Sequence, residues 1–337
     1  MSTATIAAGL LFVFGGAGAW MTWMPGDSAP ASLPDASEEE IRLAEALEAD
    51  VRFLADEIGE RNLFTPGSME TSVQWIGERM EAIGYEPRIK PYALRGIRVP
   101  ELAGREARNL VAEVPGEDKP EKILVVGAHY DSVPGSPGAN DNASGMAALL
   151  ALAEWFRENP QPVTLRFVAF ANEEYPFFKT PDMGSYAWAE QALERGDDII
   201  AMMSMDGIGY FSDAPDSQHY PLPGIGLLYP DQGNFIGFIT RSRDASLVRR
   251  AIRAFRESAS LPSEGAALPA AIDGVAFSDH WSFWQHDIPA FLVTDTLPFR
   301  DPYYHSSGDT PERLDYERMA RLVKGLRATV ERLARGD

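Results

Sequence analysis

Apolar residues follow two alternating patterns along this chain. Short continuous apolar runs, such as "KILVVGA" and "TLRFVAF", are separated by longer segments in which apolar residues recur every three or four positions. Runs of the first kind are typical of strands buried on both faces of a sheet, and segments of the second kind are typical of amphipathic helices. Strands that alternate with helices predict a three-layer α/β/α sandwich with a mixed, mostly parallel central sheet.

The predicted helices begin at a capping-box pattern, in which Ser37 is followed by Glu40. We expect helices over residues 38–58, 68–83, 143–156, 183–196, 244–258 and 312–334. We expect strands over residues 107–114, 122–128, 164–170, 198–206, 234–240 and 290–295. A Pro- and Gly-containing insertion over 209–233 has no periodic pattern and is expected at the rim of a site.

The start of the chain has a different composition. Residues 1–25 carry no charged side chain and match the roughly 20 residues of a bilayer span, and Trp20 and Trp23 suit a membrane interface. We therefore predict a transmembrane anchor. Ala17-Gly18-Ala19 resembles a cleavage site, which leaves a cleaved signal segment open, as well as a buried helix. Residues 26–37 are predicted to be a linker, and residues 38–337 the folded domain, placed outside the cytoplasm at the cell surface or in the periplasm, or secreted after cleavage.

Charge and cysteine content exclude several classes of function. The net charge is −20, from 50 acidic and 30 basic residues, and such a surface repels nucleic acid. The chain has no cysteine, so disulfides, thiolate zinc sites and thiol nucleophiles are excluded. There is no glycine-rich phosphate loop and no G-x-S-x-G motif.

Side chains that bind metals follow the ends of the predicted strands. Ligands of open α/β sheets bind at these carboxyl ends, so residues that follow different strands meet at one edge. Each residue alone has a simpler explanation, as a loop residue, a helix cap or a solvated carboxylate, but together they favour a site. The candidates are His129, Asp131, Asp141, Glu173, Glu174, Asp206, Tyr304 and His305.

Two histidines and three carboxylates form a ligand set that suits zinc. If one carboxylate bridges, two ions about 3.5–4 Å apart share five side chains, as in two-metal hydrolases. The adjacent carboxylates Glu173 and Glu174 are tolerable beside such a cation, because one can serve as a ligand while the other takes a proton from water.

Six motifs together resemble those of the M28 zinc metallopeptidases, which are co-catalytic aminopeptidases and their relatives. They are "GAHYDSVPG", "GANDNASG", "ANEEYPFF", "SMDGIGY", "SDHWSFW" and "YYHSSGDTPERLDY", and they occur in the family's order and spacing. The resemblance extends from Ser37 to the C-terminus. One departure is Tyr175, where a related subgroup often has proline.

The resemblance implies a role for each candidate ligand. His129 and Asp206 bind one zinc ion, Glu174 and His305 bind the other, and Asp141 bridges both. The peptide bond that follows the bridging residue is expected to be cis.

The resemblance also implies roles for residues that do not bind the metal. Glu173 is the general base, Asp131 orients the histidine ligand near it in sequence, and Tyr304 donates a hydrogen bond to the oxyanion. Asp279 and His280 match a supporting motif. Aromatic residues after the strands are either core residues or walls of a substrate pocket: Phe177, Phe178, Tyr210, Phe211, Trp281 and Trp284.

The resemblance therefore implies a zinc aminopeptidase that acts on peptides with a free N-terminus. Three alternatives remain open: a single-zinc glutaminyl-peptide cyclotransferase, an M28 carboxypeptidase, and a non-catalytic relative. Tyr304 before His305 favours a peptidase, since the cyclases have tryptophan there, and retention of all five ligands disfavours a non-catalytic protein.

Overall fold

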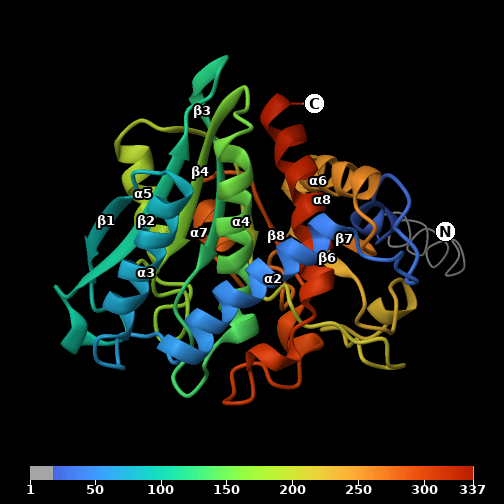
Figure 1. The fold of residues 1–337 in the computed structure, drawn as a ribbon, viewed down its shortest axis with the longest axis horizontal. Coiled ribbons are helices and arrows are strands. Elements are labelled where there is room, and N and C mark those ends of the chain that lie inside the picture. The colour runs from blue at the N-terminus through green and yellow to red at the C-terminus, as the bar shows by residue number, and fades with distance from the viewer. Residues whose placement is uncertain (1–17, 337) are drawn as a thin grey trace, which may run out of the picture.

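A mixed sheet of eight strands forms the centre of the computed structural model, which describes residues 18–336 (Figure 1). The strand order is β1-β2-β4-β3-β5-β8-β6-β7. The strands are β1 (Arg88–Ala93), β2 (Glu106–Val114), β3 (Lys119–His129), β4 (Val163–Phe170), β5 (Asp198–Met205), β6 (Ile236–Arg241), β7 (Ser263–Leu268) and β8 (Ala290–Thr294). Strands β4, β3, β5 and β8 are mutually parallel, whereas β2 pairs antiparallel with β4, and β6 with β8.

Helices cover both faces of this sheet, which confirms the predicted three-layer fold (Figure 1). One face carries α2 (Glu38–Arg52), α3 (Ser68–Ile83), α4 (Gly145–Arg157), α6 (Ala245–Ser258) and α8 (Tyr316–Arg335). The other face carries α5 (Gly184–Glu194) and α7 (His280–Gln285). Because strand side chains alternate between faces, Leu124 and Val126 of β3 belong to the first core and Val125 to the second.

Most predicted elements agree with the structure, with differences at their ends. The Ser37–Glu40 capping box is present: Glu40 N donates to Ser37 Oγ, and Ser37 N donates to the Glu40 carboxylate. The first predicted helix is divided, since α2 ends at Arg52 and a wider π-helical turn covers Phe53–Ile58. Helix α8 begins at Tyr316 rather than at residue 312, because Asp315 caps its first turn.

Two strands were absent from the sequence prediction. Both β1 ("RIKPYA") and β7 ("SEGAAL") lie at the edges of the sheet. An edge strand has one paired neighbour, so it tolerates the proline in β1 and needs no continuous apolar run.

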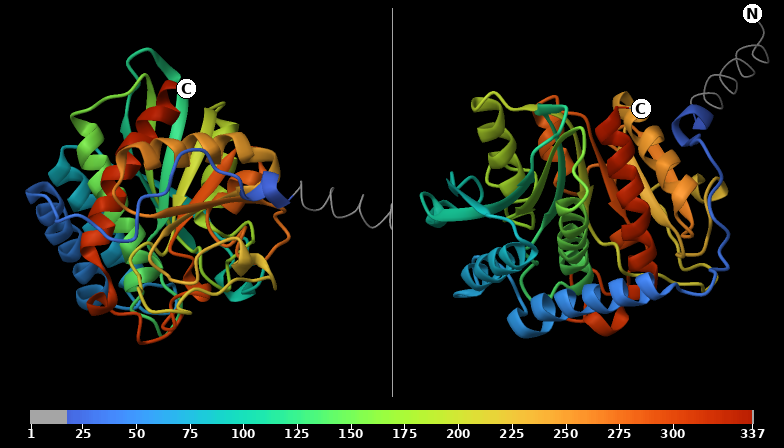
Figure 2. Two further views of the ribbon diagram at one scale, coloured as in Figure 1. Left: turned by 90° about the vertical axis from the view of Figure 1, so that its right-hand side faces the viewer. Right: turned by 45° about the horizontal axis from the view of Figure 1, so that its top comes forward.

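The segment before α2 packs against the outer side of the domain, beside α6 (Figure 2). Met24 is buried where it contacts β7, and Arg256 of α6 donates to the carbonyl oxygen of Gly26. Ser263 N of β7 donates to Ser28 Oγ at 2.8 Å. This segment therefore contributes packing contacts and hydrogen bonds to the fold.

No helix within residues 18–336 is long and apolar enough to cross a membrane. This finding contradicts the predicted membrane anchor and the localisation that followed from it. Trp20 and Trp23 suggested a membrane interface, but their rings instead lie against Arg249. The Cζ atom of Arg249 lies 4.7 Å from the ring centroid of Trp20 and 5.3 Å from that of Trp23. The rest of the predicted span, residues 1–17, lies outside the described residues.

Gly127 in β3 offers a test of the central packing. A Cβ at this position would lie 2.4 Å from Phe170 Cε2, so Gly127→Ala should destabilise the protein by about 1–3 kcal/mol through overpacking. Gly77 in α3 is the matched control: its nearest neighbour is 3.8 Å away, and Gly77→Ala should stabilise by roughly 0.5–1 kcal/mol through helix propensity. Urea unfolding measures both, and equal midpoints for the two variants would contradict this account of the core.

Candidate metal centre

The candidate residues meet at the edge of the sheet where β3, β4 and β5 have their carboxyl ends. His129 is the last residue of β3, and Asp206 directly follows β5. Glu173 and Glu174 lie in the loop after β4. These strands are mutually parallel and adjacent, so the side chains that follow them converge without any distortion of the sheet.

Two clusters of ligand atoms share one carboxylate. In the first, His129 Nε2 lies 3.3 Å from Asp141 Oδ1 and 3.2 Å from Asp206 Oδ1. In the second, His305 Nε2 lies 3.1 Å from Asp141 Oδ2 and 3.2 Å from Glu174 Oε2. The ligand atoms of each cluster lie within 4.8 Å of one another. Each oxygen of Asp141 therefore faces a different histidine and a different second carboxylate.

The residues of this site fit divalent metal ions. Glu173 Oε1 and Glu174 Oε1 are buried and find no hydrogen-bond partner among the described residues. Carboxylate oxygens without donors are costly to bury, and a cation removes that cost. Imidazole nitrogens with carboxylate oxygens, in the absence of any cysteine, are a ligand set that zinc accepts.

Burial dominates the electrostatics of the carboxylates. It raises the pKa of Glu174 to about 7, with the neighbouring charge of Asp141 adding to the shift. It also raises the pKa of Glu173 well above its usual range. Burial opposes the shift at Asp141, but the two histidines outweigh it and lower the pKa of that carboxyl. These surroundings thus favour the ionised form of Asp141 and the protonated form of the two glutamates, and a nearby cation would oppose the shifts at the glutamates.

Asp131 links the first cluster to the two glutamates. Its carboxylate accepts hydrogen bonds from Glu173 N at 3.0 Å and Glu174 N at 3.1 Å. The same carboxylate lies 3.4 Å from His129 Nδ1. One side chain therefore orients the histidine and fixes the backbone of both glutamates.

The loop that carries Asp141 is held by several side chains, of which Asp309 was missed by the sequence prediction. Asp309 accepts hydrogen bonds from Asn140 N at 2.7 Å and Asp141 N at 3.1 Å. Asn142 Nδ2 donates to Met205 O, and the Asp141–Asn142 peptide bond is cis. Asp309 stands four residues after His305 in a quoted motif, which is the signal that could have indicated it.

Arg61 supports the same loop from behind. It is fully buried and donates to five carbonyl oxygens, including those of Tyr130, Pro137 and Gly138. These bonds tie the segment before α3 to the loop between β3 and α4. Nothing in the sequence around Arg61 distinguishes it from a surface arginine, so it was not predicted.

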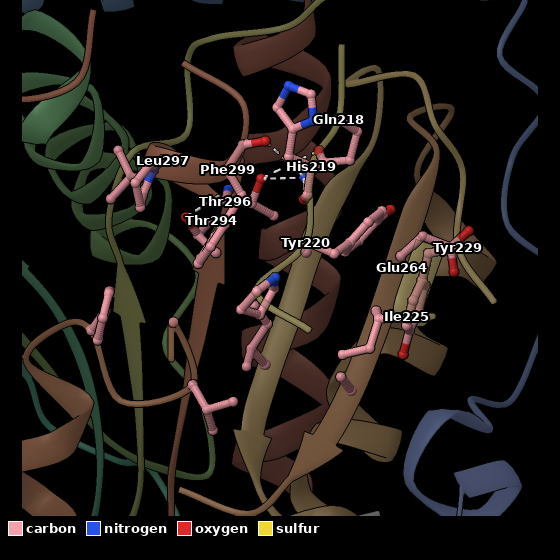
Figure 3. Close-up of a pocket in the computed structure, with 18 of the residues that line it drawn as sticks. Gln218, His219, Tyr220, Ile225, Tyr229, Glu264, Thr294, Thr296, Leu297 and Phe299 are labelled. Carbon is pink, nitrogen blue, oxygen red and sulfur yellow. Dashed lines mark hydrogen bonds between the residues drawn. The ribbon is translucent and has the colours of Figure 1, made fainter. Parts of the chain in front are cut away.

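Tyr304 lies between the second cluster and a pocket. Its ring stacks on that of His305, with ring centroids 3.7 Å apart. Burial raises the pKa of Tyr304, so the phenol keeps its proton and can donate it in a hydrogen bond. Figure 3 shows the pocket, whose lining includes Tyr304 and is mostly apolar.

The remaining candidates are the six aromatic residues and the supporting motif, Asp279 and His280. The six aromatic residues predicted as core or pocket wall are absent from the lining of this pocket, which instead uses Tyr220, Tyr229, Phe235, Phe277 and Phe299. Asp279 and His280 are fully buried at the start of α7, where His280 Nε2 lies 2.8 Å from Val275 O.

Comparison with known sequences places this geometry in context. The family model described as peptidase family M28 matches residues 109–330. Uncharacterized protein YfbL of Escherichia coli strain K12 is 37% identical over 84% of this chain and 86% of its own length. A probable leucine aminopeptidase 1 of Trichophyton verrucosum is 26% identical over 88% of this chain and 78% of its own length.

Solved structures share the fold. The zinc aminopeptidase BSAP of Bacillus subtilis superposes with a TM-score of 0.66 at 16% identity, covering 89% of this chain and 95% of its own. A glutaminyl cyclase of Bacteroides thetaiotaomicron superposes with a TM-score of 0.63 at 16% identity, covering 91% and 100%.

Without metal, the stability of the protein should fall as the pH rises. Burial raises the pKa of Asp279 and Asp295 to about 7, whereas both titrate near pH 4 in an unfolded chain. A raised folded pKa means that the stabilisation is complete below about pH 4 and is lost as the pH rises to about 7. In chelator, thermal unfolding should occur at a lower temperature at pH 8 than at pH 5, and zinc should reverse much of the loss. Equal unfolding temperatures in chelator would contradict this.

Proposed function

The chain belongs to peptidase family M28, and on this premise we propose that it is an aminopeptidase that hydrolyses N-terminal peptide bonds at a site for two zinc ions. Family membership, with leucine aminopeptidases among the relatives, supports a metal-dependent peptidase, which is a hydrolase that acts on peptides. The observation that carries the finer proposal is the pair of contacts made by Asp141, whose two carboxylate oxygens face His129 and His305 separately.

Five side chains would hold the metal. His129 and Asp206 would bind one ion, Glu174 and His305 the other, and Asp141 both. Zinc bound there would polarise the carbonyl group of the substrate and would lower the pKa of water at the site.

The other polar groups of the site carry the proton transfers and the charge. Glu173 belongs to neither ligand cluster, and its buried carboxylate takes a proton from the attacking water and then passes it to the leaving amine. The Tyr304 hydroxyl donates a hydrogen bond to the developing oxyanion. Asp131 positions the Glu173 backbone and the ring of His129 while this occurs.

The pocket beside Tyr304 supports cleavage at the N-terminal end. In the proposed aminopeptidase, this pocket would take the side chain of the first residue of the substrate. The residues that line the pocket are mostly apolar. No lysine or arginine is among the described residues that line it, whereas Glu264 and Asp273 are. A carboxypeptidase needs a cation for the terminal carboxylate of its substrate, so this lining favours an aminopeptidase.

A glutaminyl-peptide cyclotransferase is the second candidate. The shared fold with the Bacteroides thetaiotaomicron glutaminyl cyclase favours it. That chemistry uses a single zinc ion, whereas the two clusters around Asp141 provide ligands for two.

The Glu173→Gln variant tests the assigned base. It should bind the same amount of zinc and have a similar KM, while kcat falls by about 10²–10⁴-fold because the amide cannot accept the proton. Glu158→Gln, at an exposed position after α4, is the matched control and should match the wild-type protein. A Glu173→Gln enzyme with kcat within a few-fold of wild type would refute the assignment.

Metal content and substrate chemistry separate the two candidate functions. We expect about two zinc ions per chain, loss of activity in chelator, and cleavage of aminoacyl amides but not of their N-acetylated forms. One zinc ion per chain, together with ammonia release from N-terminal glutaminyl peptides, would replace the aminopeptidase by the cyclotransferase.

A further inference from the structure

The apolar pocket crosses three strands of the sheet (Figure 3). Alternate residues of neighbouring strands form its floor, as expected for side chains on one face. They are Leu292 and Thr294 of β8, Gly237 and Ile239 of β6, and Glu264 and Ala266 of β7. The insertion between β5 and β6 lies opposite, where Tyr220 and Tyr229 stack with ring centroids 5.8 Å apart.

The pocket connects Tyr304 with a carboxylate on the outermost of these strands. Thr294 pairs with Gly237, and Gly237 pairs with Glu264, so the three residues form one row across the sheet. Two strand spacings separate the ends of this row, which places the Cα atoms of Thr294 and Glu264 roughly 10 Å apart. Figure 3 shows Thr294 and Leu297 on one side of the pocket and Glu264 and Tyr229 on the other.

Glu264 lies in this apolar pocket, and few contacts offset the cost of burying its charge. Its side chain is 26% exposed, and its one ion pair within residues 18–336 is a long contact of 3.8 Å to Arg256. That arginine is already committed to the carbonyl oxygens of Ser263 and Gly26, at 2.7 and 2.9 Å. Burial raises the pKa of Glu264, and Arg256 only partly opposes the shift. A cation that enters the pocket would relieve this cost.

We propose that Glu264 makes the pocket selective for substrates whose first residue has a long aliphatic side chain ending in a cation, namely lysine or arginine. The apolar floor packs against the aliphatic part, and the carboxylate pairs with the terminal charge. Leucine fills the part of the pocket near Tyr304 but leaves Glu264 without a partner. This specificity rests on the aminopeptidase activity proposed above.

Three fluorogenic aminoacyl amides, of lysine, arginine and norleucine, test the proposal in the zinc-loaded protein. Norleucine has an unbranched chain without the charge, so the lysine-to-norleucine ratio of kcat/KM isolates the contribution of the cation. In Glu264→Gln this ratio should fall by about tenfold or more, mainly through KM for lysine and arginine, while norleucine cleavage stays within about twofold of wild type. Glu264→Asp, which keeps the charge, should retain most of the preference.

The matched control is Glu257→Gln, an exposed glutamate on α6 outside the pocket, which should leave the ratio unchanged. An unchanged ratio in Glu264→Gln would overturn the proposal. An equal loss for all three amides would also overturn it, because Glu264 would then support the pocket without choosing the substrate. A wild-type protein that loads zinc but cleaves none of the amides would instead refute the aminopeptidase activity itself, which is a separate result.

Discussion

Negative charge buried at the carboxyl edge of the sheet is the constraint on which the rest of this structure depends. Asp141, Glu173, Glu174 and Asp206 are each at most 5% exposed. Carboxyl groups in such surroundings must carry protons or face cations. Protons would leave these groups unable to bind a metal ion or to act as a base, whereas bound metal ions would make several of them ligands and would leave one for the proton transfer proposed above. The parallel strands bring these carboxyl side chains together, and the burial of the side chains favours a bound cation.

The backbone around these carboxylates is held by residues distant in sequence. Asp131 fixes the two glutamates after β4, Asp309 fixes the loop of Asp141, and Arg61 fixes that loop from the opposite side. Each of these bonds joins segments that meet only in the folded domain. Binding of a metal ion at these side chains would therefore be linked to folding, since the unfolded chain cannot present the ligands together.

Sequence patterns predicted the strands that have an apolar run and the polar residues that follow strands. They failed where contacts between segments distant in sequence determine the structure. Strands β3, β4 and β5 were evident as apolar runs, and the five candidate ligands as polar groups at strand ends, but β7 lacks such a run. Arg61 and Asp309 were missed because they bind backbone groups that lie far away along the chain. The membrane prediction failed at Trp20, because composition suggested a bilayer interface for this residue, whereas its ring lies against Arg249.

The packing of the N-terminal segment on β7 also bears on self-association. A terminal strand ordinarily exposes a row of free amide and carbonyl groups, which is a template for joining another sheet. Here Ser28 accepts from Ser263 N, Arg256 donates to Ser263 O, and the Tyr229 hydroxyl donates to Gly265 O. Side chains from three segments thus occupy positions that a ninth strand would need, and together they disfavour edge-to-edge aggregation.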